Sequence, residues 1–85
     1  MEADTLHARI EHRIAELRAA FASIEACRAS LEHWQENGEP RHALQLELRR
    51  PQQQTLVSGP ARTSAEAAVQ AAFELAEPKL RADHA

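Results

Sequence analysis

Two adjacent residues, Asn37 and Gly38, restrict the fold of this chain more than any other feature of its sequence. Both residue types accept positive φ angles, which the two central positions of a type I′ turn require, and this turn joins antiparallel strands with the correct twist. The flanking segments 25–34 and 42–50 are therefore predicted to pair as a hairpin. The number of residues on each side of the turn then fixes which residues face each other.

The side chains that this register brings together support it. On one face of the hairpin, apolar residues oppose apolar residues: Leu31 faces Leu44, Ala29 faces Leu46, and Cys27 faces Leu48. On the other face Arg28 opposes Glu47, an expected ion pair, and Trp34 opposes Arg41, an expected cation–π contact. A register shifted by two residues would set Arg28 against Arg49, so we prefer the first register.

A short third strand is predicted over 55–58, where Gly59 and the proline after it close it. The pattern leaves open whether Leu56 or Val57 points toward the core. Because Pro40 has no N–H group for a ladder hydrogen bond, we expect the hairpin to fray beside its turn.

The segment 5–22 shows the three-to-four residue spacing of an amphipathic helix, with an apolar stripe that runs from Leu6 to Ile24. Asp4 or Thr5 can cap its first turn. The opposite side of this helix carries charges that nearly cancel, which is typical of a solvent-exposed face.

A second amphipathic helix is predicted over 64–77, where Thr63 and Glu66 have the spacing of a capping box. Pro78 lacks the N–H group that the helix needs, so we expect the helix to end near residue 77 and 79–85 to form a loose tail. The order of elements is then α-β-β-β-α. We predict a single α+β domain over 1–85, in which two helices pack on one face of a three-stranded antiparallel sheet.

Composition narrows the class of protein further. The 85 residues leave room for one domain, and the formal net charge is −3, whereas nucleic-acid-binding domains are usually basic. Cys27 is the single cysteine, which excludes an intrachain disulfide and a cysteine metal cluster. Since no signal peptide or long apolar run is found, we expect a cytoplasmic protein that does not contact a membrane.

The residues that could carry chemistry do not form a catalytic or metal-binding pattern. His33 and His42 face each other in the hairpin, but zinc prefers three or four protein ligands and no further ligand lies nearby on that face. Cys27 falls on the core face with no histidine opposite, so we interpret it as a small apolar residue. We therefore predict a protein that is not an enzyme, with no cofactor, no metal and no small-molecule substrate.

The surface offers two candidate binding regions. The outward face of the first strand carries a mixed set that suits an interface with another molecule: Arg28, Ser30, Glu32 and Trp34. Arginine and tryptophan together can also stack on single-stranded bases. Basic residues elsewhere could form a broken rim around the third strand and the second helix: Arg49, Arg50, Arg62, Lys79 and Arg81.

Four segments share their pattern and spacing with a known family: A-E-L-R-A-A-F (15–21), I-E-A-C-R-A-S-L-E (24–32), L-Q-L-E-L-R (44–49) and A-E-A-A-V-Q-A-A-F-E-L (65–75). Together they resemble the ribosome hibernation-promoting factor and ribosome-associated inhibitor family. The resemblance covers nearly the whole chain and implies a non-enzymatic protein that binds the small ribosomal subunit and its RNA and silences idle ribosomes. The phosphate contacts are then expected from the basic residues: Arg28, Arg49, Arg50, Arg62, Lys79 and Arg81.

The resemblance also implies a strand ahead of the first helix, and here only residues 1–4 precede that helix. The strand 25–34 is therefore expected to be an open edge of the sheet, which invites pairing with another chain. We predict homodimerisation or partner binding by strand addition along this segment.

Two other functions remain open. The double-stranded RNA-binding domain has the same α-β-β-β-α order, and it resembles this chain in its small helix residues Ala67, Ala71 and Ala72. The other alternative is a protein–protein interaction domain without RNA contact, which the negative net charge favours.

Overall fold

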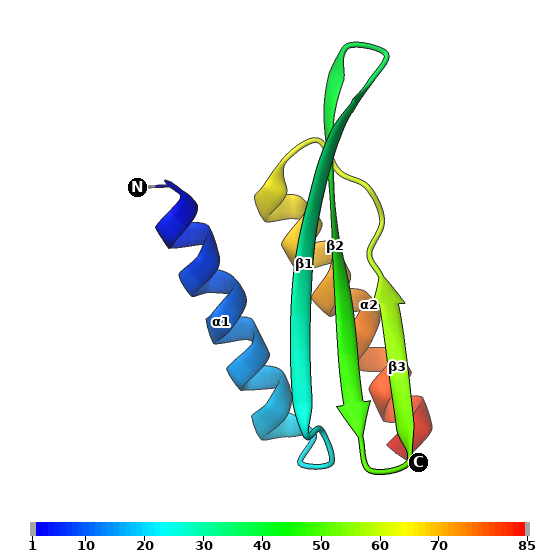
Figure 1. The fold of residues 1–85 in the computed structure, drawn as a ribbon. Helices are drawn as coiled ribbons and strands as arrows, with labels where there is room; N and C mark the ends of the chain where they lie inside the picture. The colour runs from blue at the N-terminus through cyan, green and yellow to red at the C-terminus, as the bar shows by residue number, and fades with distance from the viewer. Residues whose placement is uncertain (1, 85) are drawn as a thin grey trace.

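The computed structural model describes residues 2–84, which fold in the predicted order α-β-β-β-α. The elements are α1 (Glu2–Ala20), β1 (Ala26–Glu36), β2 (Glu39–Arg50), β3 (Gln53–Ser58) and α2 (Ala65–His84). The strands form one antiparallel sheet in the order β1-β2-β3. α2 lies against one face of this sheet, and α1 lies beside β1 on the side away from β2 (Figure 1).

The predicted register of the hairpin is confirmed. Leu31 pairs with Leu44, and the pairing continues to Glu36 and Glu39 on either side of the turn. Asn37 and Gly38 have φ angles of 54° and 80°, as a type I′ turn requires. The expectation that the hairpin frays beside its turn is wrong.

Pro40 leaves the hairpin intact, and the reason is the direction in which its backbone points. The residue two positions further along β2, His42, exchanges backbone hydrogen bonds of 2.7 and 2.8 Å with Arg62, on the side of β2 away from β1. Backbone groups alternate in direction along a strand, so Pro40 also points away from β1. The N–H group that proline lacks is therefore not needed for pairing with β1.

The third strand is longer than predicted and its orientation is now fixed. Val57 and Thr55 are buried, whereas Leu56 is 54% exposed on the other face of the sheet. Gly59, just beyond β3, donates its N–H to the Leu44 carbonyl at 2.9 Å. A Cβ atom at Gly59 would lie only 2.7 Å from the Cβ of Ala72, so glycine permits the close approach of α2 to the sheet.

The core lies between α2 and the inner face of the sheet. Its buried side chains come mainly from β2 and α2: Leu44, Leu46, Leu48, Val57, Val69, Ala72, Phe73, Ala76 and Leu80. The alternating leucines of β2 and the three-to-four spacing of α2 therefore meet as their patterns predict.

α2 does not end before Pro78, and the prediction of a loose tail over 79–85 is wrong for the described residues up to 84. A proline inside a helix costs about 3 kcal/mol in lost hydrogen bonding and steric conflict. Leu80 continues the apolar stripe of Phe73 and Ala76 and is 2% exposed. The burial of this leucine offsets much of that cost, so tertiary packing carries the helix past the proline.

The caps of both helices differ from the predicted ones. Ser64, rather than Thr63, caps α2, because its Oγ accepts a hydrogen bond of 3.2 Å from the N–H of Ala67. α1 begins at Glu2, so neither Asp4 nor Thr5 stands at the cap position. In both cases several residues in the same turn could serve as caps, and the sequence did not distinguish them.

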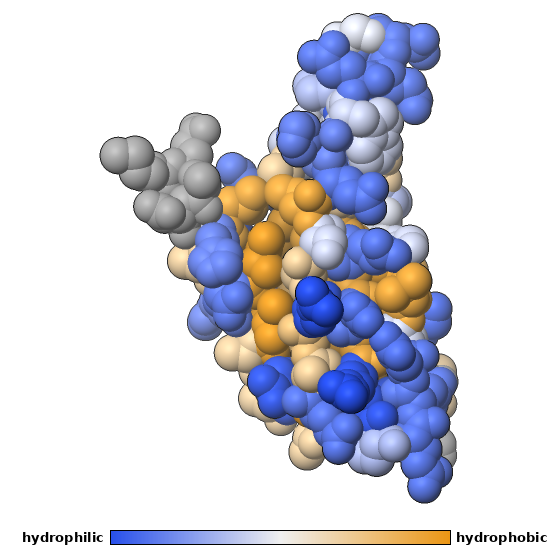
Figure 2. All heavy atoms as spheres, in the orientation of Figure 1, coloured by the Kyte–Doolittle hydropathy of each residue, from blue (hydrophilic) through white to orange (hydrophobic). Residues whose placement is uncertain are grey.

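α1 contributes to the core mainly through its C-terminal end. Leu17 and the following Ile24 are buried, whereas Leu6, Ile10 and Ile14 are only half-buried. Figure 2 shows hydrophobic residues at the surface in the space between α1 and the sheet. The apolar stripe of α1 is thus partly uncovered along its N-terminal half.

Candidate functional site

The sheet has one face without helices, which we call the outer face. It is the face toward the viewer in Figure 1, where the strands pass in front of α2. The predicted interface residues Arg28, Ser30, Glu32 and Trp34 of β1 are all exposed there. The outer face is therefore a polar surface of the sheet that a macromolecule could contact directly.

Arg28 and Arg49 come together on this face. They line one shallow pocket with Ala26, Glu47 and Gln54. Arg28 faces Glu47 across the hairpin, and Arg49 is two residues further along β2. Diagonal neighbours of this kind are about 7–8 Å apart at their Cα atoms, a separation that long side chains can span.

The guanidinium groups of Arg28 and Arg49 have no hydrogen-bond or ion-pair partner among the described residues. The ion pair expected between Arg28 and Glu47 is not formed, and the Glu47 carboxylate instead accepts a hydrogen bond from the amide of Gln54 at 2.5 Å. Gln54 thus holds the carboxylate on the β3 side. Both guanidinium groups keep their donors available to an external acceptor such as a phosphate.

Trp34 and Arg41 face each other as predicted, but the expected cation–π contact is absent from the described residues. Arg41 instead lies 3.7 Å from the carboxylate of Glu39 on the same strand. Trp34 is 39% exposed near the tip of the hairpin. Its ring is accessible for stacking, although it stands several residues away from the two free arginines.

The other predicted RNA-binding residues are dispersed over the molecule. Arg50 donates to the Oγ1 of Thr55 at 2.7 Å, and Arg81 lies 3.7 Å from the carboxylate of Glu77. Arg62 is tied to the carbonyl of its neighbour Ala61 at 2.9 Å. Lys79 is exposed on α2, so the structure groups only Arg28 and Arg49 of the six residues.

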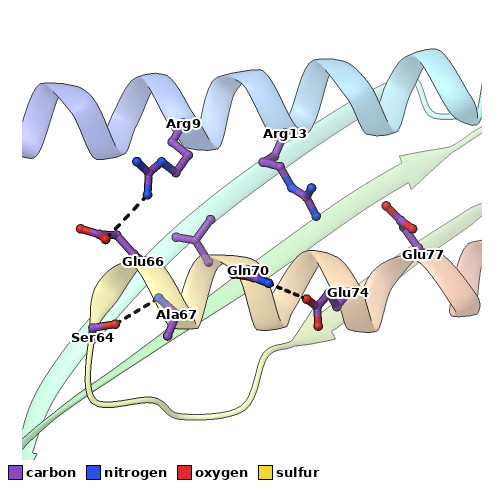
Figure 3. Close-up of a pocket in the computed structure, with 9 residues that line it drawn as sticks. Arg9, Arg13, Ser64, Glu66, Ala67, Gln70, Glu74 and Glu77 are labelled. Atoms are coloured by element: carbon purple, nitrogen blue, oxygen red, sulfur yellow. Dashed lines mark hydrogen bonds and ion pairs between the residues drawn. The ribbon is translucent and has the colours of Figure 1, made fainter.

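A second polar region lies between the two helices, and we call it the helix groove. Figure 3 shows Arg9 and Arg13 of α1 on one wall and acidic residues of α2 on the other. Arg9 lies 3.7 Å from Glu66, and Arg13 lies over the ring of Phe73, with its guanidinium carbon 5.3 Å from the ring centre. This groove could not be predicted from the sequence, because it depends on how the helices pack.

The helix groove has the chemistry of a packing interface rather than that of a reaction centre. Arg9 pairs with Glu66 across the groove, and Glu74 accepts a hydrogen bond from Gln70 at 2.9 Å. Among the described residues that line it, only Ser64 carries a hydroxyl group, and that oxygen caps α2. Among the described residues one ion pair, Arg9–Glu66, therefore links α1 to α2, and an exposed pair of this kind contributes little to stability.

The histidines and the cysteine occupy the predicted positions. The rings of His33 and His42 lie 6.4 Å apart, and no group of three metal-ligating side chains occurs in the described part of the chain. Cys27 is half-buried, and this burial raises the pKa of its thiol, while the charge of Arg18 acts in the opposite direction. A raised pKa disfavours the thiolate, so Cys27 has the properties of a packing residue.

Comparison of the chain with protein-family models, with curated proteins and with solved structures gave no match. Neither helix within residues 2–84 has the length and hydropathy needed to cross a membrane. The assignment of function therefore depends on the surfaces described above and on the sequence resemblance.

Proposed function

We propose that this chain is a non-catalytic domain that binds the small ribosomal subunit through its RNA. The observation that supports it most directly is the pair of unengaged arginines, Arg28 and Arg49, on the uncovered face of the sheet. Apart from the strand expected ahead of the first helix, the α-β-β-β-α order matches the arrangement that the resemblance to ribosome hibernation factors implies. In this proposal the two guanidinium groups bind phosphates of ribosomal RNA.

Arginine suits this role because its planar group donates several hydrogen bonds to phosphate in a fixed geometry. A sheet face that no helix covers can approach an RNA backbone closely. Trp34 on the same face adds a ring on which a base can stack. Arg62 and Lys79 are assigned secondary, longer-range contributions, since they stand apart from the pair.

The two contacts set the expected salt dependence. Each phosphate neutralised contributes a slope of about −0.7 to −0.9 in the logarithm of affinity against the logarithm of salt concentration. Two contacts therefore predict that affinity falls by about tenfold between about 50 and 200 mM salt. Contributions from Arg62 and Lys79 would make the fall steeper.

The test is co-sedimentation of the purified protein with small ribosomal subunits at those two salt concentrations. The variant Arg28→Ala/Arg49→Ala should bind more weakly and show a shallower salt slope. Arg9→Ala/Arg81→Ala is the matched control, since it removes the same charge from two arginines that are already paired with Glu66 and Glu77. Equal losses in the two double variants would show that only net charge matters and would refute the site.

A further inference from the structure

β3 forms one edge of the sheet, and within residues 2–84 it pairs only with β2. Folded proteins usually protect an edge strand with charged side chains or proline, because its unpaired backbone groups are a template for another strand. β3 carries neither a charged residue nor a proline. The opposite edge, β1, carries Arg28, Glu32 and Glu36. β3 is therefore the less protected of the two edges.

The hydrogen bonds of β2 identify the backbone groups that β3 leaves unpaired. Gly59, just beyond β3, donates its N–H to the Leu44 carbonyl at 2.9 Å, so Leu44 directs its backbone groups toward β3. Alternate residues of a strand point in the same direction, so Leu46 also points toward β3, where it faces Val57. The residues of β3 with outward-directed N–H and C=O groups are therefore Gln54, Leu56 and Ser58.

Two of the three large apolar side chains that are exposed among the described residues stand beside this edge. Leu56 lies on the outer face and is 54% exposed, and Leu75 lies on α2 and is 47% exposed. Both line an open groove of about 670 Å³ between β3 and α2, together with Pro78 and Lys79. The exposed apolar surface thus extends over both layers of the domain, from the sheet to the helix behind it (Figure 1).

We propose that two copies of this chain pair through their β3 edges, antiparallel and symmetric about Leu56, to form one six-stranded sheet. Leu56 then faces Leu56 of the second copy, and Gln54 faces Ser58 of the second copy. These facing residues are hydrogen-bonded pairs, and they use all the outward-directed groups of both strands. Since β3 has no charged residue, no like charges meet across the axis. The inference does not rest on ribosome binding.

The two layers of the exposed surface favour a second copy over a single added strand. A lone strand would cover Leu56 but leave Leu75 exposed, because Leu75 belongs to the helical layer. A partner that covers both leucines needs a sheet edge with a helix behind it at the same depth. A second copy of this chain has that arrangement.

The spacing of the helices in the symmetric pair is that of packed helices. Figure 1 shows α2 crossing behind β2 and β3. Neighbouring strands are about 4.8 Å apart, so where α2 passes behind the midline of β2 and β3 its axis lies about 10 Å from that of its copy. Packed helices have axes about 8–10 Å apart, so Leu75 and Pro78 fill the space between the two helices.

The size of the paired surface agrees with a weak, reversible dimer. α2 has 20 residues and is therefore about 30 Å long, and the domain is 16 Å thick along its shortest axis. The side formed by β3 and α2 then measures about 500 Å², so that a pair buries about 1,000 Å², the lower limit for a specific interface. We expect a dissociation constant on the order of tens of micromolar.

Sedimentation equilibrium of the purified chain measures the pairing directly. Between about 5 and 500 μM the mean mass should rise from near that of one chain toward that of two. Leu56→Glu sets two carboxylates opposite each other on the symmetry axis, so it should weaken dimerisation by at least about tenfold. Ser30→Glu is the matched control, because it adds the same charge at an exposed residue in the middle of β1, and it should leave dimerisation unchanged.

A disulfide cross-link gives a second test, which does not depend on weakening a contact. Facing residues of a hydrogen-bonded antiparallel pair have Cα atoms about 5.5 Å apart, within the range that a disulfide spans. Cys27 is the single cysteine, so Cys27→Ser/Leu56→Cys has one thiol and should form a covalent dimer under mild oxidation. Cys27→Ser/Ser30→Cys should stay monomeric at the same concentration.

Three results would overturn the proposal. They are a chain that stays monomeric at about 500 μM, dimerisation that Leu56→Glu leaves unchanged, and cross-linking through Ser30→Cys but not through Leu56→Cys. The last result would place the pairing at the β1 edge. No ribosomal subunit is present in these experiments, so failure here leaves the arginine site standing, and loss of ribosome binding leaves the dimer standing.

Discussion

The C-terminal half of α2 should contribute strongly to stability, although a proline stands at its start. Leu80 is 2% exposed and continues the buried stripe beyond Pro78. Replacing a fully buried leucine by alanine costs about 2–5 kcal/mol, since both the transfer free energy and a cavity contribute. For Leu80→Ala we expect about 3 kcal/mol, within a total stability of about 4–13 kcal/mol for a domain of this size.

Urea unfolding followed by far-ultraviolet circular dichroism measures this cost. A small domain loses about 1 kcal/mol of stability per molar urea, so Leu80→Ala should lower the midpoint by about 3 M or leave the protein partly unfolded. Leu75→Ala is the control, because Leu75 lies on the same helix but is 47% exposed, and it should change stability by less than about 1 kcal/mol. Similar midpoints for the two variants would show that residues 79–84 are not packed and would refute the reasoning.

Three further predictions concern single positions. Ser64→Ala should lower the free energy of unfolding by about 1 kcal/mol through loss of the capping hydrogen bond of α2, while Thr63→Ala should lower it much less. Urea midpoints in the opposite order would show that Thr63 is the cap. Gly59→Ala should cost about 1–3 kcal/mol, because the new Cβ meets α2 and a strand carbonyl at 2.7 Å, and an unchanged thermal midpoint would contradict that contact. Cys27 should react with iodoacetamide along a pH profile displaced upward from that of the urea-unfolded chain, since burial keeps the folded thiol protonated to higher pH; coincident profiles would show that the thiol is exposed.

The sheet was the most predictable part of the fold. Asn37 and Gly38 favour one kind of turn, and the alternation of Leu44, Leu46 and Leu48 indicates which face of the strand is buried. These are local constraints that agree with each other, so the register followed from them. The direction of β3 could not be obtained in this way, because Leu56 and Val57 are both apolar and only the completed sheet decides which is buried.

The end of α2 shows why a local rule can fail. Pro78 disfavours a helix by itself, and the prediction weighed that cost without the burial of Leu80, which depends on contacts far away in the sequence. The capping error has a similar origin, since Thr63 and Ser64 both suit a cap position. A small difference in capping free energy between neighbouring residues cannot be predicted from their spacing alone.

The sequence could predict that Arg28 and Arg49 lie together, but not where the other candidate residues lie. Arg28 and Arg49 meet because the hairpin register places them on one face, and that register could be predicted. Arg50 turns inward to Thr55, and Arg81 pairs with Glu77 once α2 extends past Pro78. The helix groove depends on the packing of α1 against α2, for which the sequence carries no local signal.

Binding of the small ribosomal subunit tests the central claim most directly. At about 50 mM salt the unaltered protein should co-sediment with the subunit, and its affinity should fall about tenfold at about 200 mM. Arg28→Ala/Arg49→Ala should weaken binding and flatten that dependence, while Arg9→Ala/Arg81→Ala should retain both. Absence of co-sedimentation at the lower salt concentration, or a salt slope that the first double variant leaves unchanged, would contradict the account.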